Sequence, residues 1–105
     1  MYDDVIYKGR FIWNRLKAEA NLKKHRIAFE KATELFDDPF FIEEYDEENS
    51  ENEDRYNIVG FVEGKYITVS FTLRDNLTRV FSAREADAEE EGAYDENIRK
   101  HIGKR

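Results

Sequence analysis

Four arginines lie in or beside segments of the second half of the chain that are rich in β-forming residues: Arg55, Arg74, Arg79 and Arg84. Arginine stays charged at any ordinary pH, and its planar guanidinium donates hydrogen bonds in pairs to phosphate oxygens. A sheet that gathers several arginines on one face can therefore stabilise the negative charge of a bound phosphate. The same arginines can instead form ion pairs with the carboxylates of this acidic chain. The sequence leaves both interpretations open.

The charge of the chain is unevenly distributed. The 105 residues carry a net charge of −7, but residues 37–54 hold ten acidic residues and no basic one. Residues 85–96 hold seven more acidic residues, again without a basic one. Outside these two segments, 17 basic residues stand against 7 acidic ones. A basic body between two acidic segments can still present a positive surface to phosphate.

The composition excludes several classes of protein. The chain has no cysteine, which excludes disulfide scaffolds, cysteine-ligated zinc sites and thiol nucleophiles. It has neither an EF-hand-like spacing nor a glycine-rich phosphate loop, so we expect no metal site and no cofactor. The longest stretch without a charge, Tyr66 to Leu73, is far below the roughly 18 to 20 residues of a membrane-spanning helix. We expect one cytoplasmic domain, residues 1–105, that does not contact a membrane.

Hydrophobic periodicity and turn residues predict an α+β fold. After a short strand at 11–13, whose start near Val5 is left open, Asn14 is a suitable N-cap for a helix. A second, amphipathic helix stops at Pro39, and the chain then changes to the period-2 pattern of strands. The predicted order is β-α-α-β-β-β-β-α, an antiparallel sheet with helices on one face. The other predicted elements are helices at 15–24, at 28–36 and after the N-cap Asp87, and strands from 40 and at 56–62, 66–73 and 78–83.

The alternation of residues 66–73 predicts which faces of the sheet are polar. Its polar positions, and Arg74 that continues them, are expected on a face that the chain's own helices leave uncovered, because buried hydroxyls would lack partners. Arg79 and Arg84 are an odd number of positions apart, so in a flat strand they cannot point to the same face unless Arg84 lies beyond the end of the strand. The polar positions of the strand are Tyr66, Thr68, Ser70 and Thr72.

A series of short strings runs through both early helices and the sheet in a characteristic order. The strings are Phe11-Ile12-Trp13-Asn14, Lys17, Asn21, Lys24-His25, Phe29-Glu30, Phe36-Asp37-Asp38-Pro39, Glu53-Asp54-Arg55, Gly60, Thr72-Leu73-Arg74, Arg79 and Ser82-Ala83-Arg84. This series resembles the BrnT family of toxins, from residue 11 to about residue 94, about four fifths of the chain. Two positions depart from the family pattern: Arg26, where glycine is common, and Glu91, where a base is common.

The resemblance implies the toxin half of a bacterial type II toxin–antitoxin pair. Such a toxin has a RelE-like fold and acts as a metal-independent ribonuclease that cuts RNA to inhibit translation. A BrnA-like antitoxin would neutralise it, and the complex would repress its own operon, so that DNA is contacted only indirectly through the antitoxin. We expect more than one toxin copy, a homodimer within the complex. The alternative is a non-catalytic binding module that acts through antitoxin binding and operon autoregulation.

The resemblance also implies roles for particular residues. Cutting RNA by internal transfer requires a deprotonated 2′-hydroxyl, stabilised charge on the phosphate and a protonated leaving oxygen. His25 is a candidate general acid or base, or alternatively a cap for the end of the first helix. Tyr66 is a candidate for stacking on a nucleobase, or alternatively a half-buried strand tyrosine. The catalytic candidates are Arg55, Arg74, Arg79, Arg84 and His25, and the substrate-binding candidates are Lys17, Lys24, Ser82 and Tyr66.

The last helix carries an apolar stripe of Tyr94, Ile98 and Ile102 among basic residues. Such a stripe fits either the hydrophobic core or a surface that a partner covers. The sequence leaves both interpretations open.

Overall fold

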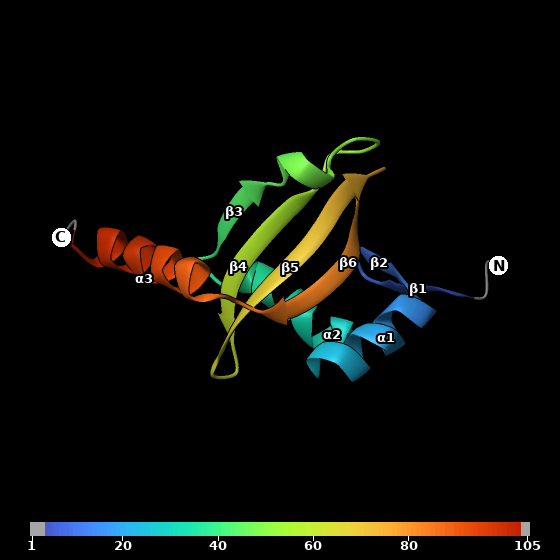
Figure 1. Ribbon diagram of the computed structural model, residues 1–105, viewed down its shortest axis with the longest axis horizontal. Helices are drawn as coiled ribbons and strands as arrows, with labels where there is room; N and C mark the ends of the chain where they lie inside the picture. Colours follow the sequence, from blue (N-terminus) through green and yellow to red (C-terminus); the bar gives the residue numbers. More distant parts are fainter. Residues whose placement is uncertain (1–3, 104–105) are drawn as a thin grey trace.

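The computed structural model describes residues 4–103, which form a six-stranded sheet with helices around it (Figure 1). The strand order is β1-β2-β6-β5-β4-β3, and neighbours are antiparallel except β2 and β6, which are parallel. No helix within the described residues is long and apolar enough to cross a membrane. The strands are β1 (Val5–Lys8), β2 (Phe11–Asn14), β3 (Ile42–Tyr45), β4 (Tyr56–Val62), β5 (Lys65–Arg74) and β6 (Leu77–Glu85). The helices are α1 (Arg15–His25), α2 (Phe29–Ala32) and α3 (Ala88–Ile102), with 3₁₀ turns η2 (Thr33–Asp37) and η3 (Glu47–Asn49).

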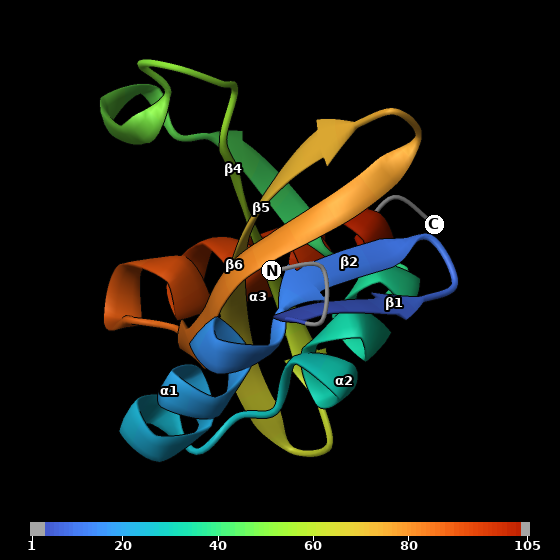
Figure 2. The same cartoon turned by 90° about the vertical axis from the view of Figure 1, so that its right-hand side faces the viewer.

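The predicted α+β class and order of elements are confirmed, and they are consistent with a RelE-like fold. Several details differ from the prediction. One pair of strands, β2 and β6, is parallel, and the expectation that the helices lie on one face is wrong, because α3 covers the other face of the sheet. The first strand is a hairpin of β1 and β2, turned at Gly9, whose φ of 58° favours glycine (Figure 2). The second helix has one α-helical turn before it tightens into η2. There the Thr33 hydroxyl donates to the Glu30 carbonyl oxygen (2.8 Å), a local bond that competes with the helical pattern.

One face of the sheet carries the main hydrophobic core, which α1, α2 and η2 cover. Trp13 of β2 lies edge-on to Phe29 of α2, with ring centroids 5.9 Å apart. At Gly60, η2 packs directly on the backbone of β4, and a Cβ atom there would lie 2.7 Å from the Leu35 Cγ atom. A larger residue at this position would therefore push η2 away from the sheet.

Asn21 of α1 joins this helix to the edge of β6. The strand β2 pairs with β6 only as far as Arg79, because the chain leaves the sheet at Asn14 to begin α1. The buried Asn21 side chain then accepts from the Ala83 N–H (3.1 Å) and donates to the Ala83 carbonyl oxygen (2.9 Å). It also donates to the Ile27 carbonyl oxygen (3.0 Å). One side-chain amide thus takes the place of a neighbouring strand.

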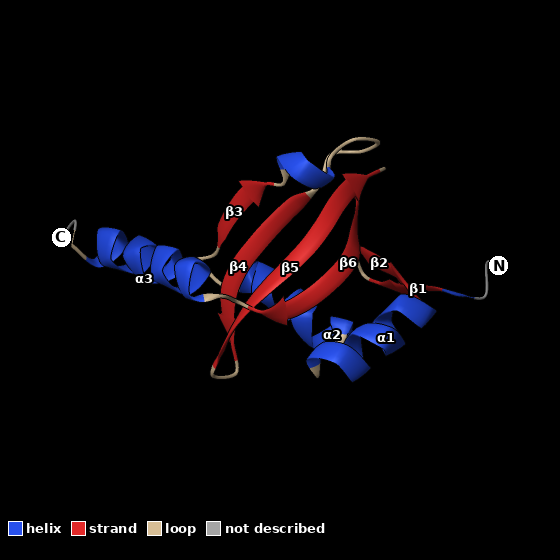
Figure 3. Cartoon of the chain, viewed as in Figure 1, coloured by secondary structure: helices blue, strands red, loops and turns tan. Residues whose placement is uncertain are grey.

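The helix α3 packs on the opposite face of the sheet from α1 and α2, and it extends beyond the strands (Figures 1 and 3). The Tyr94 hydroxyl donates to the Asp38 carboxylate (2.6 Å), which also accepts from the Phe61 N–H (2.8 Å). Burial and the hydrogen bond to Asp38 both raise the pKa of Tyr94. The apolar stripe is therefore core at Tyr94, which is 4% exposed, and surface at Ile102, which is 57% exposed.

The prediction that the polar sheet face is uncovered by the chain's own helices is wrong for Tyr66 and Thr68. The Tyr66 hydroxyl donates to Asp95 of α3 (2.8 Å), and the Thr68 hydroxyl donates to Glu90 of α3 (3.0 Å). Thr68 is consequently buried, yet its hydroxyl has a charged partner. The physical argument failed because carboxylates on α3 supply the partners that the sequence did not reveal.

Arg26, at the end of α1, has a left-handed backbone with φ 61°, and its N–H donates to the Leu22 carbonyl oxygen (2.9 Å). This is the conformation that glycine adopts without strain at a helix C-terminus. A side chain there costs on the order of 1 kcal/mol. The helix therefore ends in a left-handed residue although the side chain there is not glycine.

We predict that Asn21→Ala lowers the free energy of unfolding by about 2 to 4 kcal/mol, because both backbone groups of Ala83 lose their partner. Urea denaturation measures the loss. The control Asn52→Ala removes an exposed asparagine and should change stability by less than about 0.5 kcal/mol. Equal stability of the two variants would contradict the anchoring role of Asn21.

Candidate active site

A β-bulge in β6 determines which side chains share the polar face. Ser70 of β5 lies opposite Ser82, and the next residue, Phe71, lies opposite Val80, so Phe81 has no partner across the pair. An extra residue on one strand shifts the alternation of all side chains that follow it. On the polar face, β6 therefore presents its odd-numbered residues before Phe81 and its even-numbered residues after it.

This shift places Arg79 and Arg84 on the same face. Arg79 lies opposite Thr72 and Arg84 lies opposite Thr68, and these two threonines are four residues apart on β5. Residues four apart on a strand point to the same side. The expectation from a flat strand, that the two arginines point to opposite faces, is therefore wrong, because the strand is bulged.

Arg55, Thr72 and Arg79 form the first row of this face. Arg55 directly precedes β4, and its guanidinium lies 4.0 Å from the centroid of the Phe81 ring. Its backbone is fixed from both sides, because its N–H donates to the Ser50 hydroxyl (2.9 Å) and its carbonyl accepts from the Asp46 N–H (2.8 Å). Within residues 4–103, no hydrogen bond or ion pair engages the Arg79 guanidinium, which leaves its donors available to a ligand.

A neutral polar row follows next to the first. The Ser70 hydroxyl donates to the Asn57 side-chain oxygen (2.7 Å), and Ser82 lies opposite Ser70. All three residues are half-buried. Hydroxyl and amide groups of this kind can orient a sugar–phosphate backbone without repelling its charge.

Arg84 at the far end of the face is already paired. Its guanidinium binds both carboxylate oxygens of Glu90, at 2.8 and 2.9 Å. Glu90 also completes the capping box of α3 with Asp87. Burial by itself raises the pKa of Glu90, but the hydrogen bonds that Arg84 and the Asp87 backbone donate outweigh it, so the pKa is lowered. Arg84 is thus a structural cation in this arrangement.

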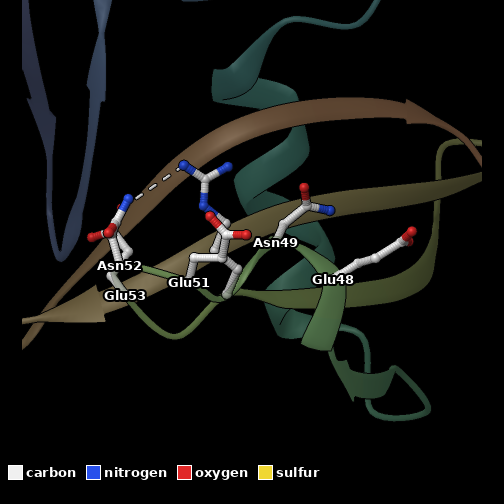
Figure 4. Close-up of a pocket in the computed structure, with 6 residues that line it drawn as sticks. Glu48, Asn49, Glu51, Asn52 and Glu53 are labelled. Carbon is white, nitrogen blue, oxygen red and sulfur yellow. Dashed lines mark ion pairs between the residues drawn. The ribbon is translucent and has the colours of Figure 1, made fainter.

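Arg74 is the fourth arginine and lies at the exposed end of β5. It forms an ion pair with Glu53 (2.8 Å), whose carboxylate is also 3.9 Å from Arg55. Glu53 belongs to an acidic loop whose side chains line an open hollow beside Arg55 (Figure 4). Arg74 and Arg55 therefore share one carboxylate, which lies closer to Arg74.

The predicted residues of α1 lie along the edge of β6. The Lys17 ammonium is 5.9 Å from the centroid of the Phe81 ring. Lys24 is two helical turns further on and shares this stripe of the helix. His25 is the half-buried last residue of α1, and within the described part of the chain no hydrogen bond joins its ring to the four arginines.

Tyr66 lies outside the arginine group. Its ring packs edge-on against Phe61 and Tyr94, at centroid distances of 5.1 and 5.8 Å. The hydrogen bond to Asp95 and burial raise the pKa of Tyr66. Helix α3 therefore holds Tyr66 at the end of the sheet that is remote from Arg55.

Sequence reasoning missed Phe81 and Asn57, which complete this face. One signal for Phe81 was present. Val80 and Ala83 are both apolar but three residues apart, which breaks the period of a flat strand.

No group of three or more histidine, cysteine, aspartate or glutamate side chains that could hold a metal ion lies together within residues 4–103. The arrangement as a whole offers cations and hydroxyls to an anionic ligand.

We predict that Glu90→Gln destabilises the fold by about 1 kcal/mol at neutral pH, since solvent screens part of this half-exposed ion pair. The lowered pKa means that the stabilisation is complete above the usual glutamate pKa of about 4.3 and disappears as pH falls through the lower folded value. Thermal unfolding of the wild type and of Glu90→Gln at several pH values measures whether their stabilities become equal as the pH falls. Glu89→Gln is the matched control, and a gap independent of pH would contradict the ion-pair assignment.

Comparison with known proteins identifies the family of the chain. The family model described as "Ribonuclease toxin, BrnT, of type II toxin-antitoxin system" matches residues 13–90, about three quarters of the chain. Among curated proteins, none matches the chain. The matched region contains all four arginines, the bulge and Asn21. The chain therefore belongs to the BrnT family of ribonuclease toxins of type II toxin–antitoxin systems.

Proposed function

We propose that this toxin cleaves RNA by internal transfer, without a metal ion, on the sheet face that carries Arg55 and Arg79. The observation that carries this proposal is the first row of the face. There the guanidinium groups of Arg55 and Arg79 lie on either side of Thr72, next to the row of hydroxyl and amide side chains, and Arg79 has no carboxylate partner within residues 4–103. The chain acts as one domain, residues 1–105.

In this mechanism the 2′-oxygen of a ribose attacks the adjacent phosphorus as the bond to the 5′-oxygen breaks. The 2′-hydroxyl loses its proton and the 5′-oxygen gains one, so the products are a 2′,3′-cyclic phosphate and a 5′-hydroxyl. Arg55 and Arg79 stabilise the charge that builds up on the phosphate oxygens. Lys17 and Lys24 bind the RNA backbone along α1, and Ser82 contacts it in the middle of the face.

The other predicted residues are not assigned to the phosphate in this proposal. Arg84 and Arg74 reach a phosphate only if Glu90 and Glu53 give way, because both arginines already bind these carboxylates. A role for His25 in proton transfer, and one for Tyr66 in stacking on a base, stay predictions.

The family places this toxin with a cognate antitoxin and an RNA substrate. We further propose that the antitoxin is BrnA-like, that it covers the cationic face, and that DNA is bound only through it. The toxin acts in the cytoplasm, where cleavage of RNA inhibits translation. The exposed end of the α3 stripe, at Ile102, is then a contact between two toxin copies in the complex.

The pairing of Arg84 with Glu90 and of Arg74 with Glu53 favours a second candidate function. If these carboxylates neutralise part of the positive charge of the face, the protein no longer cleaves RNA but still binds the antitoxin. Expression of the toxin alone in a bacterium separates the two. Growth arrest supports the ribonuclease, whereas harmless expression with tight antitoxin binding supports the binding module.

We predict that Arg79→Ala lowers the kcat of RNA cleavage by on the order of 100-fold and abolishes growth arrest, since it removes transition-state charge stabilisation. Cleavage of a labelled RNA and induced expression are the two measurements. Arg99→Ala removes an exposed arginine of α3 that pairs with Glu96, and it should leave both readouts unchanged. Full activity of Arg79→Ala would remove the central residue of the proposal.

The proposed mechanism, which uses no metal ion, leads to a separate prediction. Cleavage should proceed at an unchanged rate in excess EDTA, because the two guanidinium groups supply the positive charge at the phosphate. The reaction product should carry a 2′,3′-cyclic phosphate, detectable by mass spectrometry. Loss of activity in EDTA that returns with Mg²⁺ would contradict this mechanism.

A further inference from the structure

The Phe81 ring holds two cations without neutralising them. The Arg55 guanidinium lies 4.0 Å from the ring centroid and the Lys17 ammonium lies 5.9 Å from it. The face of an aromatic ring attracts a cation through its quadrupole, but it carries no net charge. An arginine held by a ring therefore keeps its full charge for a ligand.

Two other arginines of the face, Arg74 and Arg84, are held by carboxylates instead. Arg84 binds Glu90 through two hydrogen bonds, and Arg74 binds Glu53 at 2.8 Å. A carboxylate orients a guanidinium and also cancels its charge. The chain has 24 acidic residues against 17 basic ones, so carboxylate partners for arginine are abundant. The ring keeps Arg55 in place where Glu53, 3.9 Å away, is a weak partner.

The β-bulge is what brings the ring to this position. Phe81 is the residue without a partner in the β5–β6 register, and it lies between the rows of Arg79 and Ser82. Bulges redirect side chains and are frequent beside active sites. Without the extra residue, the position beneath Arg55 would belong to a side chain of the regular alternation.

We propose that Phe81 is a positioning residue of the ribonuclease site, which holds the Arg55 guanidinium over the sheet face beside Arg79 with its charge intact. This inference rests on the proposed function of the arginine face. It assigns to Phe81 no contact with the reacting phosphate. The ring acts through Arg55, and Lys17 adds a second cation at its rim.

Kinetics of RNA cleavage by two variants test the proposal. Phe81→Leu keeps an apolar side chain but removes the ring, whereas Phe81→Tyr keeps the ring. We expect Phe81→Leu to lower kcat about tenfold with KM changed less than about twofold, because Arg55 acts on transition-state charge. Phe81→Tyr should retain the wild-type kcat. Phe41→Leu, at an exposed phenylalanine between η2 and β3, is the matched control and should leave both constants unchanged.

A double-mutant cycle distinguishes positioning from direct contact. Adding Phe81→Leu to Arg55→Ala should cause no further loss of kcat, because the ring acts through the arginine. A further tenfold loss in the double variant would overturn the proposal and would indicate that the ring stacks on a nucleobase. Wild-type kinetics of Phe81→Leu alone would overturn it as well.

A spectroscopic readout separates this inference from the proposed function. The ring current of Phe81 should shift the Arg55 Nε–H resonance upfield in the wild type and in Phe81→Tyr, and Phe81→Leu should remove the shift. Unchanged amide signals elsewhere show that the variant is folded. An unshifted Arg55 resonance in the wild type overturns the inference. A shifted resonance in a toxin that cleaves no RNA supports the positioning of Arg55 and counts against the proposed function.

Discussion

The geometry of the arginine face depends on the side-chain amide of Asn21 and its two hydrogen bonds to the backbone of Ala83. Ala83 lies two residues after the bulged Phe81, where β6 has no second neighbouring strand. A buried strand edge without partners would be costly, and the amide satisfies it while fixing α1 alongside. The same contact therefore maintains the bulged part of β6 and places the Lys17 stripe beside it.

The site combines two ways of holding a cation. Carboxylates on the acidic loop and on α3 hold Arg74 and Arg84, which ties these segments to the sheet. An aromatic ring holds Arg55, and Arg79 is left without a charged partner in the described residues. The acidic segments thus serve as structural partners at two ends of the face, while its middle remains cationic and polar. A chain of negative net charge can in this way keep positive groups together on one surface.

Local patterns predicted the local structure well. The strand Tyr56–Val62 and the N-caps Asn14 and Asp87 follow directly from alternation and capping chemistry, which depend on near neighbours in sequence. The position of α3 did not follow, because it is set by contacts such as Tyr94 with Asp38, 56 residues away. Polar alternation on β5 indicated a face, but it could not indicate which carboxylates cover that face.

The candidate site was predicted as a set of residues and not as an arrangement. All four arginines do lie in or beside the sheet, because strand propensity placed them there. Glu53 and Glu90 form ion pairs with two of the arginines, and tertiary contacts determine which two. The bulge at Phe81 did not follow from the sequence either, because the register of β5 against β6 that creates it is a contact between two strands and not a property of one.

The single unpaired residue of β6 has a consequence for how this surface can change in evolution. A strand offers only two settings for its side chains, and one extra residue switches between them. Loss of the codon for Phe81 would leave Arg79 and Arg84 four positions apart, so a regular strand would still place them on one side of the sheet, but the ring that contacts Arg55 would be lost. Substitutions adjust such a surface gradually, whereas a deletion at this position removes the bulge and the aromatic contact of Arg55 in one step.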